Sequence, residues 1–533
     1  MRYCNKEEMK QILDQNPKYK ADLFKRGFLI TNDGSINLSE YPLYDNWSKQ
    51  ELGDYFVYIH NKQKLYTYEE QGKLFFLIGH AYNPFTLEVD EINILKNISQ
   101  KSLNGEKDYF ELISELTGVF LCGFIENKKM QIVGDCVGIQ ATYYGIVKNN
   151  IYISSHMNLI GDICDLQRDE YIDELVNYKY YKLYGPCLPG DLSIFKEIKR
   201  LVPNTYVTYE NNECKVTRFF PKYELKICSN NEEYNDVVKQ IASIFKNTLI
   251  SISKKWDNPA ISMTGGTDSK LTLAAANGIY DKFKYFSYIS QYSESIDAEA
   301  AHKICENLNQ EHKIYEISDK DEDFEDIEII RKIITYNVGN VGKLNDNDIR
   351  KRAYFRDTED FDVEVKSWAS EIVRATYYKK YHKDKLPKHL SPRNITSMYK
   401  IILNNRKLAK QTDKVFAEYI DKVDFGKNFS NYDESDMVYW EVRYGGWGGL
   451  ILTGEQRYSF EITLPFNNRY LMKLFLSAPL EYRIQDKVHR DVTDLLNKDL
   501  YNMGIHIVNY NKTNKRAFCE KMYFNLNNWF QFI

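Results

Sequence analysis

The chain has 533 residues, more than one hydrophobic core holds, because single cores stop growing near about 250 to 300 residues, so we expect two domains. Hydrophobic residues make up 43% and charged residues 27%, the balance of an ordinary folded protein. A net charge of −4 offers no broad positive field for phosphate backbones, which argues against nucleic acid as a partner.

The apolar segments and the cysteines exclude further classes. No apolar run approaches the roughly 20 residues of a membrane helix, and the start lacks the apolar core of a signal peptide. We therefore expect a cytoplasmic protein with no membrane partner. The nine cysteines form no C-x-x-C pair, and the nine histidines never fall at metal-ligand spacing. The sequence predicts neither a disulfide scaffold nor a structural metal.

Short β-type runs separated by turns dominate the first part of the chain. Roughly fifty residues precede the first convincing strand. The polar breaks at 127–129 and 148–150 predict hairpin turns, so the strands beside them are expected to be antiparallel. The predicted strands lie at 55–59, 74–79, 118–125, 131–134, 142–146, 151–154 and 204–208.

The pattern changes near residue 225. Apolar residues at helical spacing predict a long helix over 232–253, and strands then alternate with helices. Such alternation favours a parallel βαβ sheet. From about residue 380 the chain is predicted to be mostly helical, with a glycine-rich interruption at 445–449. The predicted alternation consists of strands at 260–263, 284–289 and 312–317 and helices at 269–277 and 297–308.

The segment 262–269, which joins the first of these strands to the next helix, carries the strongest functional signal. Its paired glycines let backbone N–H groups approach phosphate, its hydroxyls add donors, and the helix start adds partial positive charge. Asp268 suits such a site only if Mg²⁺ lies between its carboxylate and a polyphosphate. A plain capped βα turn is the alternative, and the Walker pattern is absent. The predicted ATP-binding residues here are Met263, Thr264, Gly265, Gly266, Asp268 and Ser269.

Together with three other segments, at 118–145, 188–204 and 460–469, this loop resembles the asparagine synthetase family, which includes β-lactam synthetases and lasso-peptide cyclases. The segments occur in the family's order. The resemblance implies an α/β plus α+β chain in two parts. Residues 1–224 would form an Ntn-hydrolase-like αββα sandwich, a degenerate glutaminase domain, and residues 225–533 a PP-loop ATP-pyrophosphatase (synthetase) domain with a parallel sheet and a helical remainder.

Three departures from the family pattern matter for function. The first is the nucleophile: glutamine-hydrolysing members attack with an N-terminal cysteine. Here position 2 is Arg2, and Cys4 would become terminal only if three residues were removed. This argues against glutamine as the nitrogen donor.

The second departure is the acidic segment 367–378, which lacks the family's glycines and aspartate. Glu371 can still offer a carboxylate to Mg²⁺, and Arg374 can offset phosphate charge. A capped helix start with Glu371 in its first turn is the alternative. The third is the catalytic lysine, for which Lys487 is the nearest match and would stabilise the developing anion. A solvated charge cluster is the alternative there, and His489 is a weaker candidate.

The resemblance implies an AMP-forming amide ligase that uses ATP and Mg²⁺. Lys487 and Glu371 would be catalytic, and Asp268 and Glu371 would hold the metal. The substrates would be a small-molecule or peptide carboxylate and an amine, and a homodimer or a biosynthetic partner protein is compatible. The alternatives are a non-catalytic or regulatory paralogue, a glutamine- or ammonia-dependent amidotransferase, and an adenylating enzyme that thiolates tRNA.

Overall fold

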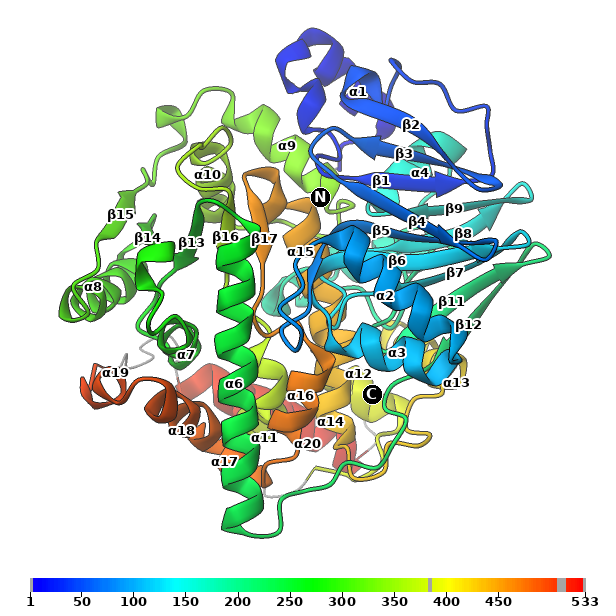
Figure 1. Ribbon diagram of the computed structural model, residues 1–533. Coiled ribbons are helices and arrows are strands. Elements are labelled where there is room, and N and C mark those ends of the chain that lie inside the picture. The colour runs from blue at the N-terminus through cyan, green and yellow to red at the C-terminus, as the bar shows by residue number, and fades with distance from the viewer. Residues whose placement is uncertain (1–2, 382–385, 506–513, 531–533) are drawn as a thin grey trace.

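The computed structural model describes residues 3–381, 386–505 and 514–530. In this part of the chain, strands form two six-stranded antiparallel sheets and one five-stranded parallel sheet (Figure 1). The first sheet has the order β10-β8-β9-β1-β3-β2, with β1 Phe28–Thr31, β2 Trp47–Leu52, β3 Tyr55–His60, β8 Tyr143–Val147, β9 Asn150–Ser154 and β10 Lys199–Arg200. The second has the order β12-β11-β7-β6-β5-β4, with β4 Leu65–Glu70, β5 Lys73–Tyr82, β6 Thr117–Glu126, β7 Lys129–Gly134, β11 Thr205–Glu210 and β12 Glu213–Arg218.

The two antiparallel sheets pack face to face, with helices on their outer faces. Ile30 and Val57 of the first sheet share a buried cluster with Ile78 of the second, whereas Leu29 points to the opposite face, as the alternation of a strand requires. Helices α2 (Glu91–Leu103) and α3 (Glu106–Glu115) bury apolar residues against the outer face of the second sheet, and α4 (Met157–Cys164) contacts β9 of the first. This helix, sheet, sheet, helix layering agrees with the expected sandwich. Its kinship with Ntn hydrolases stays a prediction.

The prediction that roughly fifty residues precede the first strand is wrong. Strands β1 and β2 both begin before residue 50, and β1 lies inside the first sheet between β9 and β3. All four residues of β1 are buried, so it lacks the alternation that marks a half-exposed strand. The predicted hairpins are confirmed, since β6 pairs with β7 and β8 with β9 in antiparallel register.

The predicted alternation after residue 225 is also confirmed as a parallel sheet. Its order is β15-β14-β13-β16-β17, and every neighbouring pair is parallel. The chain leaves β13 toward β14 on one side and later returns to β16 on the other, which creates a topological switch point between β13 and β16. The strands are β13 Pro259–Ser262, β14 Lys284–Ile289, β15 His312–Glu316, β16 Val363–Val365 and β17 Glu461–Thr463, and the helices beside them are α6 Asn231–Lys255, α7 Thr267–Ala275 and α8 Tyr292–Asn307.

The rest of the chain is mostly helical, as predicted, but the glycine-rich segment 445–449 does not interrupt a helix. It begins α15 (Gly445–Gly454), directly after the π-helix η7 (Tyr439–Tyr444). A Cβ on Gly449 would lie 2.2 Å from the Gly138 carbonyl oxygen, so this glycine serves close backbone packing. The other helices are α1 Lys6–Gln15, α5 Glu170–Asn177, α9 Ile327–Asn337, α10 Asp346–Tyr354, α11 Thr376–Tyr381, α12 Pro392–Tyr399, α13 Arg406–Lys422, α14 Glu434–Val438, α16 Arg469–Leu476, α17 Leu480–Ile484, α18 Lys487–Leu496, α19 Lys498–Asn502 and α20 Asn514–Phe530.

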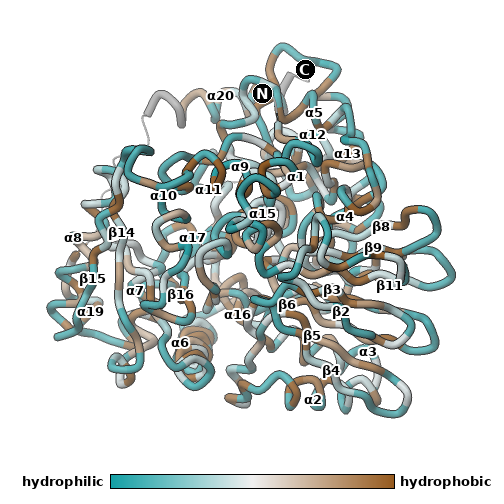
Figure 2. Tube along the Cα trace, turned by 90° about the horizontal axis from the view of Figure 1, so that it is seen from above, coloured by the Kyte–Doolittle hydropathy of each residue, from teal (hydrophilic) through white to brown (hydrophobic). Residues whose placement is uncertain are grey.

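The two predicted domains pack closely against each other. The buried Arg218 guanidinium pairs with Glu441 at 2.6 Å, and the Trp440 indole N–H donates to the Cys136 carbonyl at 2.9 Å. One buried apolar cluster includes residues of both parts, and hydrophilic segments concentrate at the outer loops (Figure 2). The boundary near 225 stays a prediction.

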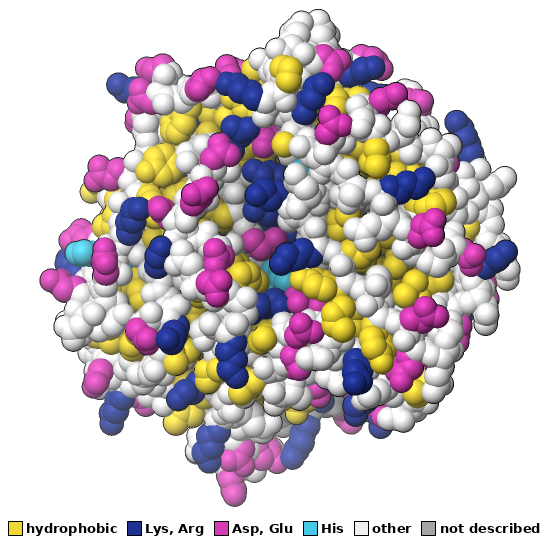
Figure 3. All heavy atoms as spheres, turned by 45° about the horizontal axis from the view of Figure 1, so that its top comes forward, with side chains coloured by type: hydrophobic (Ala, Val, Ile, Leu, Met, Phe, Trp, Pro, Cys, Tyr) yellow, Lys and Arg dark blue, Asp and Glu magenta, His cyan; other side chains and the backbone are white. Residues whose placement is uncertain are grey.

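The surface and the helices add two observations. On the face drawn in Figure 3, acidic and basic side chains are interspersed, in keeping with the small net charge of −4. Within residues 3–381, 386–505 and 514–530, no helix combines the length and the apolarity needed to cross a bilayer.

Candidate active site

The loop 263–266 leaves the carboxyl end of the central strand β13 and runs directly into α7. The Thr264 hydroxyl bonds to that of Ser269 at 2.9 Å and accepts the N–H of Gly266 at 3.2 Å. A Cβ on Gly266 would meet only the Thr264 hydroxyl, at 3.2 Å, and Gly266 lines the cavity beside the loop. Because β13 and β16 are adjacent and parallel, the segment after β16 ends at the same edge of the sheet.

Asp268 and Glu371, from these two segments, both face this edge with one carboxylate oxygen unused. Asp268 Oδ2 lies 2.8 Å from Arg374 Nη1, but its Oδ1 is buried with no hydrogen-bond partner among the described residues. The same holds for Glu371 Oε2. Burial, and then repulsion from Asp268, raise the pKa of Glu371 to about 7. Two close carboxylates with idle oxygens in a poorly solvated site are the donor set that a hard cation such as Mg²⁺ fits.

Arg374 links this carboxylate pair to α18 and its neighbours. Its Nε and Nη2 donate to the two oxygens of Asp486 at 2.8 and 2.9 Å, and Lys379 lies 2.5 Å from the same carboxylate. Burial by itself would raise the pKa of Asp486, but these two cations outweigh it and lower the pKa to about 2. Arg374 is thus held in place by its two hydrogen bonds to Asp486 and needs Asp268 less. We therefore take Asp268 as the carboxylate that is able to bind a cation in place of Arg374.

The segment after β16 keeps a strained backbone although it lacks glycines. Ala369 has φ +79° and Ala375 has φ +50°, a left-handed conformation that costs a residue with a Cβ on the order of 1 kcal/mol. Glu371 lies between them, in the short 3₁₀ helix η6 (Ser370–Val373).

A cavity of about 310 Å³ lies between the loop, the ends of β14 and β16, and the start of α8. Lys366 lines it and was not predicted from the sequence. Its Nζ lies 3.0 Å from Glu364 and 4.7 Å from the centre of the Trp368 ring, and the side chain is buried. Its place directly after the strand segment 363–365 is the signal in the sequence that could have identified it, because ligands bind at the carboxyl ends of parallel strands. The lining residues are Ser262, Met263, Thr264, Gly266, Asp268, Ser269, Ser287, Tyr288, Glu294, Asp297, Ala298, Lys366, Ser367, Trp368 and Glu371.

Asp297, on α8, also faces the loop. The Gly265 N–H donates to its carboxylate, which opposes the increase in pKa that burial causes. A phosphate bound by this N–H would have to replace Asp297, because one N–H cannot serve both acceptors fully. Glu294, one turn earlier on α8, is already paired with Lys351 at 2.5 Å.

Lys487, the predicted catalytic lysine, is not among the residues that line this cavity. It pairs with Asp491 one turn later on α18, and its Nζ lies 5.0 Å from the centre of the Tyr234 ring. The weaker candidate His489 lies closer, with Nε2 3.7 Å from Asp268 Oδ1. Burial lowers the pKa of His489 to about 4, so it is neutral near pH 7 and is no fixed cation.

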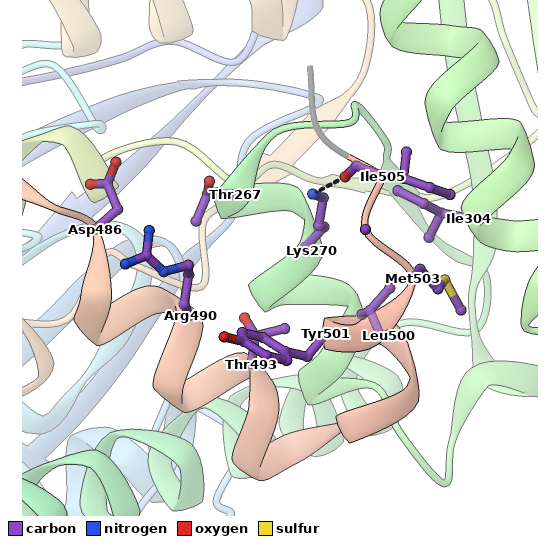
Figure 4. A pocket seen from close by; sticks show the side chains of 11 residues that line it. Thr267, Lys270, Ile304, Asp486, Arg490, Thr493, Leu500, Tyr501, Met503 and Ile505 are labelled. Atoms are coloured by element: carbon purple, nitrogen blue, oxygen red, sulfur yellow. Dashed lines mark hydrogen bonds between the residues drawn. The ribbon is translucent and has the colours of Figure 1, made fainter. Parts of the chain in front are cut away.

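A second cavity, of about 300 Å³, lies on the other side of the start of α7. Figure 4 shows Thr267, Asp486 and Arg490 among the side chains that line it, and Lys270 directed at the Ile505 carbonyl oxygen. Thr267 begins α7 directly after the loop, so only the first turn of this helix separates the two cavities.

No protein-family model matches the chain, and no curated protein does. Among solved structures, it is similar to an allosteric regulatory enzyme of purine biosynthesis, with 12% identity and a TM-score of 0.24 over 53% of this chain and 63% of that one, less than two thirds of its length. It is similar to a glutamine-dependent NAD⁺ synthetase from Acinetobacter baumannii, with 16% identity and a TM-score of 0.17 over 31% and 28%. It is also similar to a glutamine phosphoribosylpyrophosphate amidotransferase from B. subtilis, with 11% identity and a TM-score of 0.23 over 64% and 79%. These scores are too low to show a shared overall fold.

Proposed function

We propose that this chain is an ATP-dependent, AMP-forming amide ligase, in which a substrate carboxylate is adenylated and then attacked by an amine. One observation carries the proposal. At the switch point of the parallel sheet, the glycine loop lies beside two carboxylates that each keep a buried oxygen without a hydrogen-bond partner among the described residues. Ligands of open parallel sheets bind at such switch points. A buried carboxylate oxygen without a hydrogen-bond partner destabilises the folded state unless a cation binds it.

Each group around the cavity has a task in this reaction. The Gly266 N–H, the start of α7 and the hydroxyls of Thr264 and Ser269 would hold the phosphates. Asp268 and Glu371 would hold Mg²⁺, which supplies charge neutralisation for the polyphosphate. No cluster of three or more His, Cys, Asp or Glu side chains arranged for a metal occurs in the described part of the chain. This fits Mg²⁺, which binds one or two carboxylates together with substrate phosphates.

Lys366 replaces Lys487 in this proposal as the cation that stabilises the developing anion. It lines the cavity at the carboxyl end of β16, and it is buried, so water screens its charge little. Carboxylate attack on the α-phosphate yields an acyl-adenylate and pyrophosphate. Amine attack on the acyl carbon then forms the amide and releases AMP.

Glutamine is not the nitrogen donor in this proposal. Burial, and then Glu8, raise the pKa of Cys4 to about 11, so its thiol is protonated near pH 7 and is a poor nucleophile. The Cys4 carbonyl accepts a hydrogen bond from Asn340 at 2.9 Å, which ties this segment to the chain after α9.

The test is AMP and pyrophosphate release from ATP and Mg²⁺ with panels of carboxylates and amines, for the wild type and Asp268→Asn. We expect AMP as the product and loss of activity in the variant with little change in unfolding temperature, because Arg374 keeps Asp486 as its partner. Asp257→Asn, an exposed carboxylate at the opposite end of β13, is the matched control. ADP as the product, or wild-type turnover in Asp268→Asn, would refute the proposal.

A non-catalytic relative is the second candidate, and one arrangement favours it. The Gly265 N–H is occupied by Asp297, and Asp268 is partly neutralised by Arg374, so the loop is stable without a ligand. This candidate predicts that ATP and Mg²⁺ leave the unfolding temperature unchanged. Stabilisation by ATP and Mg²⁺ that disappears in Asp268→Asn would exclude it.

A further inference from the structure

The π-helix η7 places one arginine where the structure gives it no anionic partner. The side chain of Arg443 makes no hydrogen bond or ion pair within the described residues, and its Nη1 is buried. π-helical turns are rare and often occur at functional sites. In the same turn, Glu441 is fully paired with Arg218, at 2.6 and 2.9 Å, which anchors the element. The two charged residues of η7 therefore have opposite roles, one structural and one unassigned.

Aromatic rings surround Arg443, and a buried lysine lies near it. The centre of the Trp447 ring lies 6.0 Å from its Cζ, and Tyr377, Tyr399 and Tyr439 are close enough to interact with its charge electrostatically. Lys400 is near as well, and its side-chain nitrogen donates to the carbonyl oxygens of Tyr181 and Gly185. Burial, and then the charge of Arg443, lower the pKa of Lys400 well below its usual value, so it adds little positive charge here. Arg443 is a cation with a buried Nη1 and without a carboxylate partner among the described residues, and this makes its surroundings attractive to an anion.

This enclosure lies beside the candidate active site. Trp447 stacks on Trp368 with ring centres 5.1 Å apart, and Trp368 lines the cavity of the glycine loop. Tyr439 interacts electrostatically with both Glu371 and Arg443, so one aromatic ring is near both the candidate metal carboxylate and the unpaired guanidinium. A substrate whose reacting carboxylate lies near Glu371 would therefore extend toward Arg443.

We propose that Arg443 binds an anionic group, a carboxylate, at the end of the substrate that does not react, within the aromatic enclosure of Tyr439 and Trp447. A guanidinium offers a planar pair of N–H donors that matches a carboxylate, and aromatic walls exclude water around the pair. The inference rests on the proposed function for the position of the reacting end of the substrate. The anion site itself depends only on the surroundings of Arg443.

Benzoate and benzamide provide a binding test that needs no known substrate. They have the same shape, but only benzoate is charged. We expect benzoate to raise the unfolding temperature of the wild type more than benzamide does, and this preference to disappear in Arg443→Gln. A lost charge-assisted pair corresponds to binding weaker by about tenfold or more. Equal effects of the two compounds on the wild type, or an undiminished preference in Arg443→Gln, would overturn the inference.

Stability without ligand separates binding from a structural role. Arg443→Gln removes an unpaired charge, so the unfolding temperature should stay the same or rise. Arg218→Gln, the matched control, leaves Glu441 buried without its cationic partner and should lower the unfolding temperature. A large decrease in Arg443→Gln would contradict the inference.

The increase in unfolding temperature caused by ATP and Mg²⁺ separates the two proposals. This increase should be the same in Arg443→Gln and in the wild type, and it should be absent in Asp268→Asn. If benzoate binds through Arg443 but no AMP forms, the anion site stands and the adenylation proposal fails.

Discussion

Replacing Glu371 by glutamine tests the carboxylate pair most directly, because the two roles of this residue predict opposite changes in stability. Burial and the neighbouring Asp268 raise the pKa of Glu371 from 4.5 to about 7 in the folded protein. Folding therefore strengthens proton binding at this site. The stabilisation that results is complete below about pH 4.5 and is lost as the pH rises through about 7.

The size of the effect follows from the pKa shift. One pKa unit corresponds to about 1.4 kcal/mol, so ionised Glu371 lowers the free energy of unfolding by at most about 3 kcal/mol at pH 8. Glutamine keeps the size of the side chain and removes the charge. Without metal, Glu371→Gln should therefore be more stable than the wild type at pH 8, by about 1 to 3 kcal/mol, and nearly equal at pH 5. A helix-capping role instead predicts a loss of roughly 0.3 to 1 kcal/mol.

The assay is urea unfolding at several pH values between 5 and 8, in the presence of a chelator. Glu306→Gln, an exposed glutamate of α8, is the control and should show no such trend. In turnover, Glu371→Gln should lose most of its activity, with partial rescue at high Mg²⁺. Lower stability of Glu371→Gln at every pH, together with unchanged turnover, would refute the assignment of this carboxylate to the metal.

Three further predictions concern other residues. Lys366→Met should lower AMP formation by about 100-fold or more, and it is made on a Glu364→Gln background so that no unpaired carboxylate stays buried. Lys487→Met should retain most turnover. A large loss of turnover in Lys487→Met with little loss in the Lys366 variant would instead support the prediction from the sequence. Cys4→Ala should leave amide formation unchanged, and the wild type should release no glutamate from glutamine; glutamate release that is lost in Cys4→Ala would contradict this. Ala369→Gly should raise the free energy of unfolding by up to about 1 kcal/mol, because glycine adopts a φ of +79° without strain, and a loss of stability in calorimetry would show that packing of the methyl group outweighs it.

Local patterns alone predicted the elements that carry the glycine loop. An apolar strand, paired glycines, hydroxyls and a helix start follow one another within a dozen residues, and β13 and α7 lie where this order places them. Glu371 was assigned to the same site through the family resemblance, and the structure brings it next to Asp268. The glycine loop lies in one short segment, whose conformation depends mainly on neighbours in sequence, whereas the position of Glu371 beside Asp268 depends on the pairing of β13 with β16.

Tertiary structure alone decided which cation faces the cavity. Lys366 and Lys487 both follow short ordered segments, and only the pairing of β16 with β13 brings Lys366 to the loop, while α18 turns Lys487 toward Asp491. Strand β1 and the helical glycines of α15 were misjudged for a related reason. Burial on both faces removes the alternation of a strand, and close contact with a distant backbone selects glycine. The contacts between strands and between the two backbones join segments that are far apart in the sequence, so no local pattern records them.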